Sequence, residues 1–209
     1  MPDITTLLTF FITSLILAIS PGPDIIFVLT QSALYGVRAG FITICGLMTG
    51  VSFHTAAVAF GIATIFQKSD FAFTILKCIG ACYLLYLAWL SFKAGANLYN
   101  TEFKKDSINC NFWQSYRRGI FMSTTNPKVS LFFLAFLPQF CNPKGENLAI
   151  QILLLGFLFI TAASIVFSFA AILGEKMAAK LNQSIKGQIL IQRLSGIIFI
   201  CLTLALFIQ

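Results

Sequence analysis

Asp24 and Lys128 are ionisable residues inside long apolar stretches, and each directly follows a proline, Pro23 and Pro127. A charge in the middle of a membrane span costs about 2.5–3.5 kcal/mol on insertion scales, so it usually faces a protein interior or an aqueous cavity. A free amino acid carries an ammonium and a carboxylate group. We therefore expect Asp24 to lie near the ammonium, and Lys128 near the carboxylate, of a small zwitterionic ligand.

A direct ion pair between Asp24 and Lys128 is the alternative interpretation, and it would hold two parts of the protein together. The two interpretations coexist if a substrate inserts between the paired groups.

The depth of Asp24 in the membrane depends on the course of the first helix. A straight helix from Ile4 would place this residue about 30 Å along its axis, near the membrane edge, unless the helix starts later or folds back.

The residues around these charges predict interrupted helices. Proline removes a backbone donor and clashes with the preceding turn, and broken backbone is tolerated in membranes only in protein interiors or beside cavities. The helix N-termini that follow such breaks favour anionic groups such as a carboxylate. The predicted hinge residues are Pro21, Gly22, Pro23 and Pro127.

Asn126 offers a donor and an acceptor just before the second break, and we expect it to bind substrate together with Asp24 and Lys128. Ser123, Thr124 and Thr125 crowd the same turn. These polar side chains either satisfy carbonyl groups that the proline leaves free or line the substrate path.

His54 is the single histidine, and it shares a helix face with small residues at positions 46, 50, 57 and 61. Small residues at this spacing let helices approach closely. We expect the imidazole to make a hydrogen bond between helices. A proton relay, with Asp24 as a second member, is the alternative, because imidazole titrates near physiological pH.

No metal or cofactor site is expected. Cys78 and Cys82 have the i, i+4 spacing of a soft-metal pair, but no histidine or carboxylate stands nearby in the sequence to complete a ligand set. Most of the six cysteines fall in apolar segments and are expected to be small buried residues. The 23 phenylalanines are scattered through the apolar segments, where we expect lipid-facing bulk.

Composition indicates which environment must hold these residues. The chain has 209 residues, of which 58% are hydrophobic and 10% charged, and its mean hydropathy is +0.88. A soluble domain carries about 25% charged residues, so a soluble enzyme is excluded. The net charge of +7 comes without a base-reading motif, so nucleic acid is not an expected partner, and no phosphate-binding loop suggests ATP hydrolysis.

Six apolar stretches are each long enough to cross a bilayer as a helix. The sequence therefore predicts an all-α integral membrane protein. No cleavable signal is expected, because the N-terminus lacks a basic region and a cleavage site. The six predicted spans are Ile4–Thr30, Phe41–Phe66, Phe71–Phe92, Gly119–Phe140, Asn147–Ala171 and Ile189–Ile208.

The distribution of Lys and Arg predicts the orientation, because cytoplasmic loops carry an excess of them. Ten lie on one side of the spans, and both termini and three basic residues lie on the other. The ten are Arg38, Lys93, Lys104, Lys105, Arg117, Arg118, Lys176, Lys180, Lys186 and Arg193; the three are Lys68, Lys77 and Lys144. Residues 93–118 are thus a predicted cytoplasmic loop that ends in an interfacial segment, with both termini outside.

Six spans divide into two sets of three, and the second set must enter the membrane from the opposite side. The predicted organisation is a three-helix repeat over residues 1–92, the loop 93–118, and an inverted three-helix repeat over residues 119–209. The first helix of each repeat carries the break. In transporters with inverted repeats, breaks at corresponding positions mark the substrate site.

Several motifs resemble the LysE/RhtB family of bacterial amino-acid exporters. Ser20-Pro21-Gly22-Pro23-Asp24 is similar to its N-terminal PGP motif, and Asn126-Pro127-Lys128 is similar to its NPK motif. Flanking matches extend over nearly the whole chain. They are Leu76-Lys77, Gly80-Ala81, Tyr83-Leu84, the stretch Leu131 to Phe140, and Arg193-Leu194-Ser195-Gly196.

The resemblance implies a secondary transporter, not an enzyme, in the bacterial inner membrane. It implies export of amino acids or close derivatives in exchange for protons, with small-molecule substrate and lipid as partners and homo-oligomer formation left open. Cys201-Leu202-Thr203 departs from a more glycine-rich stretch of the family. Two alternatives stay open: heavy-metal or cation efflux, and a non-transporting membrane subunit that binds a partner through residues 93–118.

Overall fold

The computed structural model describes residues 2–62, 70–93, 111–142, 145, 147–181 and 185–208. Within these ranges the chain forms eight α-helices, short π and 3-10 segments, and no strand. The predicted all-α class is confirmed. The helices are α1 (Ile4–Ile19), α2 (Pro23–Tyr35), α3 (Val37–Ala57), α5 (Asp70–Lys93), α6 (Phe112–Thr125), α7 (Pro127–Leu131), α8 (Leu148–Leu181) and α9 (Ile185–Ile208).

Three of the remaining segments extend these helices. The π-helical turn η1 (Val58–Ile62) continues α3, while α7 runs into a π-helical turn, η3 (Phe132–Phe136), and a 3-10 turn, η4 (Leu137–Phe140). Gly36 alone separates α2 from α3, and its φ of 86° is a left-handed conformation that glycine adopts readily.

The first predicted helix break lies between α1 and α2. Helix α1 starts at its cap Asp3, whose carboxylate accepts a hydrogen bond from the backbone N–H of Thr6 at 2.9 Å, and ends before Pro21. Helix α2 starts with Pro23 at its first position, where the missing N–H costs nothing. The two helices are bent by 58°, so Asp24 does not lie at the end of a straight helix.

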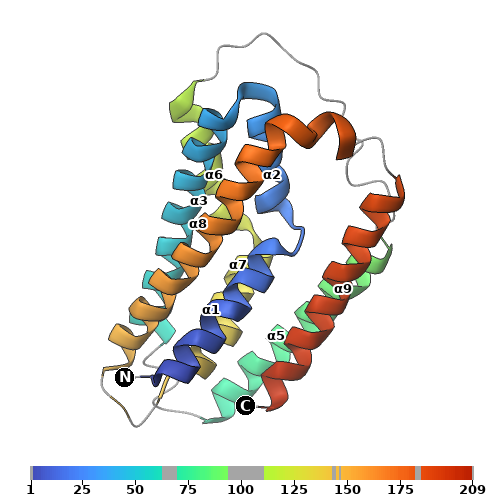
Figure 1. Cartoon of the computed structure of the whole chain (residues 1–209). Coiled ribbons are helices and arrows are strands. Elements are labelled where there is room, and N and C mark those ends of the chain that lie inside the picture. The colour runs from blue at the N-terminus through green and yellow to red at the C-terminus, as the bar shows by residue number, and fades with distance from the viewer. Residues whose placement is uncertain are drawn as a thin grey trace.

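The second break lies between α6 and α7, and as in the first break a proline begins the helix that follows. The Asn126 side chain caps α7 by accepting a hydrogen bond from the Lys128 N–H at 3.0 Å, and Pro127 is the first residue of that helix. The segment Pro127–Phe140 is bent by 50° from α6. Both breaks lie near the middle of the long axis of the protein, with α2 and α6 on one side and α1 and α7 on the other (Figure 1).

The lengths and composition of the helices are those of a membrane protein. Val37–Gly61 and Leu148–Gly174 are each long and apolar enough to span a bilayer, and up to four spans result if each bent pair crosses once. The predicted count of six spans and the inverted repeats stay predictions. Helix α1 begins, and α9 ends, at the same end of the protein (Figure 1). Of the predicted loop 93–118, residues 94–110 lie outside the described residues, and α6 already begins at Phe112.

Helices α3 and α6 pack backbone against backbone through small residues. A Cβ atom at Gly46 would collide with the carbonyl oxygen of Tyr116 and lie 3.1 Å from the Cα of Gly119. One turn further along α3, a Cβ at Gly50 would meet the Ser123 side chain at 2.6 Å. Two of the small residues that share a face with His54, Gly46 and Gly50, therefore serve close helix packing as the sequence predicts, whereas Ala57 is exposed and a Cβ at Gly61 would meet nothing within 4 Å.

Six phenylalanines pack together in the interior, on the side of the breaks that holds α1 and η3. We call them the aromatic cluster: Phe10, Phe132, Phe133, Phe136, Phe140 and Phe159. Their rings lie 5.0–6.0 Å apart between centroids. The expectation that phenylalanine serves only as lipid-facing bulk is therefore wrong for these six, although Phe60 and Phe121 are exposed.

Replacing Gly46 with alanine tests the close approach of α3 to α6. We expect Gly46→Ala to lower the free energy of unfolding by about 1–3 kcal/mol, because the added methyl group meets backbone atoms that cannot move aside. The measurement is thermal unfolding in detergent. Gly61→Ala is the matched control, since a Cβ at Gly61 meets nothing within 4 Å. Equal melting temperatures for both variants would contradict this account of the packing.

Candidate functional site

A small enclosed cavity lies between the two helix breaks. Its polar lining comes from Ser20, Asp24, Ser123, Asn126 and Lys128, which belong to both breaks and the helices beside them. Apolar side chains of α1, α2, α3, α7 and α8 complete the wall. The cavity has about 20 Å³ of space, which is enough for one water molecule but not for an amino acid. The protein is therefore closed around this site.

Lys128 connects the two breaks across the cavity. Its buried ammonium group donates hydrogen bonds to the backbone carbonyls of Leu17 at 2.8 Å and Ser20 at 2.7 Å. These carbonyls belong to the C-terminal end of α1, where the helix dipole favours a cation. The ammonium also lies 5.7 Å from the centroid of the buried Phe199 ring of α9. Lys128 thus contacts α1 and α9 from α7.

Gly22 makes room for this lysine. A Cβ atom at Gly22 would lie 3.3 Å from both Cδ and Nζ of Lys128. A side chain at this position would press against the Lys128 ammonium and its Cδ atom. The glycine of the first break therefore has a packing role in addition to its predicted role as a hinge.

Asp24 lies in the first turn of α2 and is buried. The N-terminal end of a helix stabilises a carboxylate through the helix dipole. Its Oδ1 atom has no hydrogen-bond partner, and within the part of the chain that the structure describes neither Asp24 nor Lys128 takes part in a direct ion pair. The two opposite charges share one cavity, where Lys128 is hydrogen-bonded to the end of α1 and Asp24 only lies in the first turn of α2.

Three other side chains that line the cavity have buried polar atoms without hydrogen-bond partners. The atoms are the Ser20 and Ser123 hydroxyl oxygens and the Asn126 Nδ2 amide nitrogen. An unpaired buried polar group costs about 1–3 kcal/mol. The Asn126 amide interacts with the Asp24 carboxylate, but neither Nδ2 nor Oδ1 forms a hydrogen bond of good geometry, so all four atoms around the cavity are incompletely satisfied. A ligand with donors and acceptors of its own would satisfy them.

The predicted site residues are thus partly brought together. Asp24, Asn126, Lys128 and Gly22 line the cavity, whereas the three prolines end or begin the helices around it. Thr124 and Thr125 donate to the carbonyls of Ile120 and Phe121, at 2.9 Å and 2.7 Å. Of the three hydroxyl residues before Asn126, two therefore satisfy backbone carbonyls and Ser123 faces the cavity.

His54 lies beside the site and not in its lining. Its Nε2 atom forms a 3.1 Å hydrogen bond with the backbone carbonyl of Ser123, which fits the predicted bond between helices, here α3 and α6. The role of His54 as a proton relay stays a prediction. The bond fixes the turn of α6 that presents Ser123 to the cavity.

Some lining residues carry no signal in the sequence. Met48 of α3 and Phe159 and Phe167 of α8 form part of the wall, and nothing distinguishes them from other apolar residues of their helices. Cys78 and Cys82 are exposed on α5. No group of three or more His, Cys, Asp or Glu residues occurs among the residues whose placement the structure gives.

Comparison with known proteins identifies the family. The profile of the LysE type translocator family matches residues 15–209. The homoserine/homoserine lactone efflux proteins of Salmonella typhi and Salmonella typhimurium are 37% and 36% identical to the chain over 171 residues, which are 81% of this chain and 81% of each relative.

A membrane protein of Bacillus subtilis is 30% identical over 201 residues, which cover 93% of this chain and 95% of that protein. No solved structure matches the chain. The sequence resemblance is confirmed, and the transporter family agrees with the expectation of a small-molecule exporter. The chain belongs to the LysE type translocator family.

Proposed function

We propose that this protein exports amino acids, or small zwitterions of similar size, across the bacterial inner membrane in exchange for protons. The observation that carries the proposal is the convergence of Asp24 and Lys128, from two broken helices, on one closed polar cavity. Homoserine is the first substrate to test, because the Salmonella relatives are named for efflux of homoserine and its lactone.

In this proposal the charged groups of the substrate become the partners of Lys128 and Asp24. The substrate carboxylate binds the Lys128 ammonium, and the substrate ammonium binds Asp24. Asn126 Nδ2 and the hydroxyl groups of Ser20 and Ser123, which have no partner in the closed protein, complete the binding site. A carboxylate competes well with two carbonyls for a buried ammonium, because charged acceptors form the stronger hydrogen bonds.

Binding must also open the protein, since the cavity holds little more than one water molecule. When the Lys128 ammonium leaves the carbonyls of Leu17 and Ser20, the link between α1 and α7 is broken. The two halves, each of three spans in the predicted topology, then rock about the breaks. Substrate binding thereby selects among conformations by its different contacts in each of them.

The test of transport is efflux from proteoliposomes loaded with labelled amino acids, homoserine included. We expect efflux when a proton gradient is imposed and little efflux without one. Vesicles without the protein are the control. If no amino acid leaves the vesicles under a proton gradient, the proposal is wrong.

Lys128→Met tests the carboxylate contact, because homoserine has a carboxylate and its lactone does not. A hydrogen bond to a charged group contributes about 1.5–3 kcal/mol, so we expect the apparent affinity for homoserine to fall about 10- to 100-fold. Efflux of the lactone should change far less, and this also shows that the variant folds. Lys93→Met, at an exposed lysine, is the matched control. Equal losses for both substrates would refute the assigned role.

Asp24→Asn tests the second contact and the coupling to protons. The amide has nearly the same shape but carries neither the negative charge nor a proton that can be released. We expect efflux driven by a proton gradient to be lost for homoserine and for the lactone, since both carry an ammonium group. Asp3→Asn is the control, because asparagine also caps helices well. Retention of proton-driven efflux in Asp24→Asn would contradict the role of Asp24.

His54→Gln separates the two roles of the histidine. Glutamine can donate a hydrogen bond to the Ser123 carbonyl but does not titrate. We expect His54→Gln to keep proton-driven efflux and its pH dependence, whereas His54→Ala should lower the melting temperature, because the bond between α3 and α6 is lost. A His54→Gln protein that melts like the wild type but no longer responds to a proton gradient would show that His54 is the relay.

A further inference from the structure

Helices α2 and α6 carry a polar face beyond the cavity, which is interrupted by the apolar residues Val28 and Gly119. On α2, Gln31 lies seven residues after Asp24, and on α6, Ser115 lies eight residues before Ser123. Both spacings are close to two helical turns, so each pair shares one face of its helix. Gln31 and Ser115 are buried, and the Ser115 hydroxyl donates to Gln31 Oε1 at 3.4 Å. The polar face therefore joins α2 to α6 two turns from the cavity.

The opposite side of the cavity has a different lining. There the aromatic cluster fills the space between α1, η3 and α8, and one of its members, Phe159, also lines the cavity. A zwitterion that crosses tightly packed rings loses its hydration without gaining hydrogen bonds. In this conformation the aromatic cluster closes one side of the cavity, whereas the other side holds the buried polar residues Gln31 and Ser115 next to apolar residues such as Val28.

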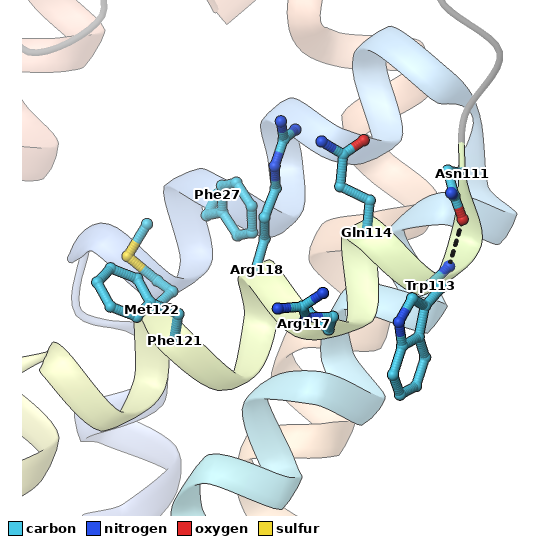
Figure 2. Close-up of a pocket in the computed structure, with 8 residues that line it drawn as sticks. All are labelled: Phe27, Asn111, Trp113, Gln114, Arg117, Arg118, Phe121 and Met122. Atoms are coloured by element: carbon cyan, nitrogen blue, oxygen red, sulfur yellow. Dashed lines mark hydrogen bonds between the residues drawn. The ribbon is translucent and has the colours of Figure 1, made fainter.

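A groove of about 740 Å³ lies on the surface of α2 and α6, and its lining includes neighbours of Gln31 and Ser115 but neither of these two residues. Figure 2 shows Gln114, Arg118 and Met122 on the side of α6 to which Phe27 of α2 also projects. Phe27 lies four residues before Gln31, and Gln114 directly precedes Ser115. Arg117 and Arg118 give the groove a positive charge that attracts a carboxylate.

We propose that the substrate reaches the cavity between α2 and α6, and that Gln31 and Ser115 form a first binding station on this route. The amide and hydroxyl groups can hydrogen-bond to both the ammonium and the carboxylate of a zwitterion. The station rests on the proposed function, because it requires that a substrate moves. If the predicted orientation holds, the route opens to the cytoplasm, where an exporter takes up its cargo.

Cysteine accessibility tests this route in the full-length protein. The background is a variant in which all six native cysteines are replaced by serine or alanine. Ser115→Cys is compared with Ser14→Cys, a matched control, because Ser14 is equally buried but lies on α1 beyond the breaks. Gln114→Cys, at an exposed position, marks the membrane side of the groove. The probe is a membrane-impermeant thiol reagent, applied to vesicles of either orientation with or without homoserine.

We expect Ser115→Cys to react from the same side as Gln114→Cys and Ser14→Cys to stay unreactive from that side. Substrate at ten times its Kd leaves about one tenth of the sites free, so labelling of Ser115→Cys should slow about tenfold. Labelling of Ser115→Cys no faster than Ser14→Cys would overturn the proposal and leave Gln31 and Ser115 as a bond between helices. The proposal would also be overturned if a substrate that the background protein exports did not slow the reaction of Ser115→Cys with the thiol reagent. A background protein that exports nothing counts against the proposed function, whereas the comparison of the two cysteines still decides the route.

Discussion

The Lys128 ammonium needs hydrogen-bond acceptors wherever it is buried, and this requirement shapes the centre of the protein. A buried cation without partners costs several kcal/mol. Here the partners are the carbonyls of Leu17 and Ser20, which are available only because α1 ends at this point. The prolines that end α1 therefore also create the acceptors for a lysine that lies more than 100 residues later in the chain.

The two breaks use helix ends in complementary ways. The C-terminal end of α1 receives the cation of Lys128, and the N-terminal turn of α2 carries the carboxylate of Asp24. The second break supplies Lys128 and caps α7 with Asn126. Opposite charges can thus lie in one cavity without pairing directly. The Lys128 ammonium, bound to backbone carbonyls, and the Asp24 carboxylate, whose Oδ1 atom has no partner, are both available to a ligand, whereas a direct ion pair would first have to be separated.

The sequence predicts the centre of this site better than its surroundings. Charges after prolines in apolar stretches are rare and costly, so Asp24 and Lys128 stand out without a structure, and Asn126 stands out as the polar residue directly before Pro127. The bond from Lys128 to α1 could not be predicted, because backbone carbonyls have no signature in the sequence. The same holds for Phe10 and Phe159, which look like any apolar residue until packing brings them together. Gln31 and Ser115 carry a weak signal as polar residues in or near apolar helices, but only the structure shows that they face each other.

The closed cavity also bears on how an exporter returns without cargo. In the proposed export cycle, the Lys128 ammonium loses a carboxylate partner when the substrate leaves, and an ammonium without partners would hold the empty protein in a state of high free energy. The carbonyls of Leu17 and Ser20 prevent this, because they accept the ammonium as soon as the carboxylate departs. Lys128 then has partners at every stage, either from the substrate or from α1. Asp24 has no such substitute for its Oδ1 atom, so in the proposed exchange for protons this carboxylate is the group that we expect to take up a proton when the protein is empty.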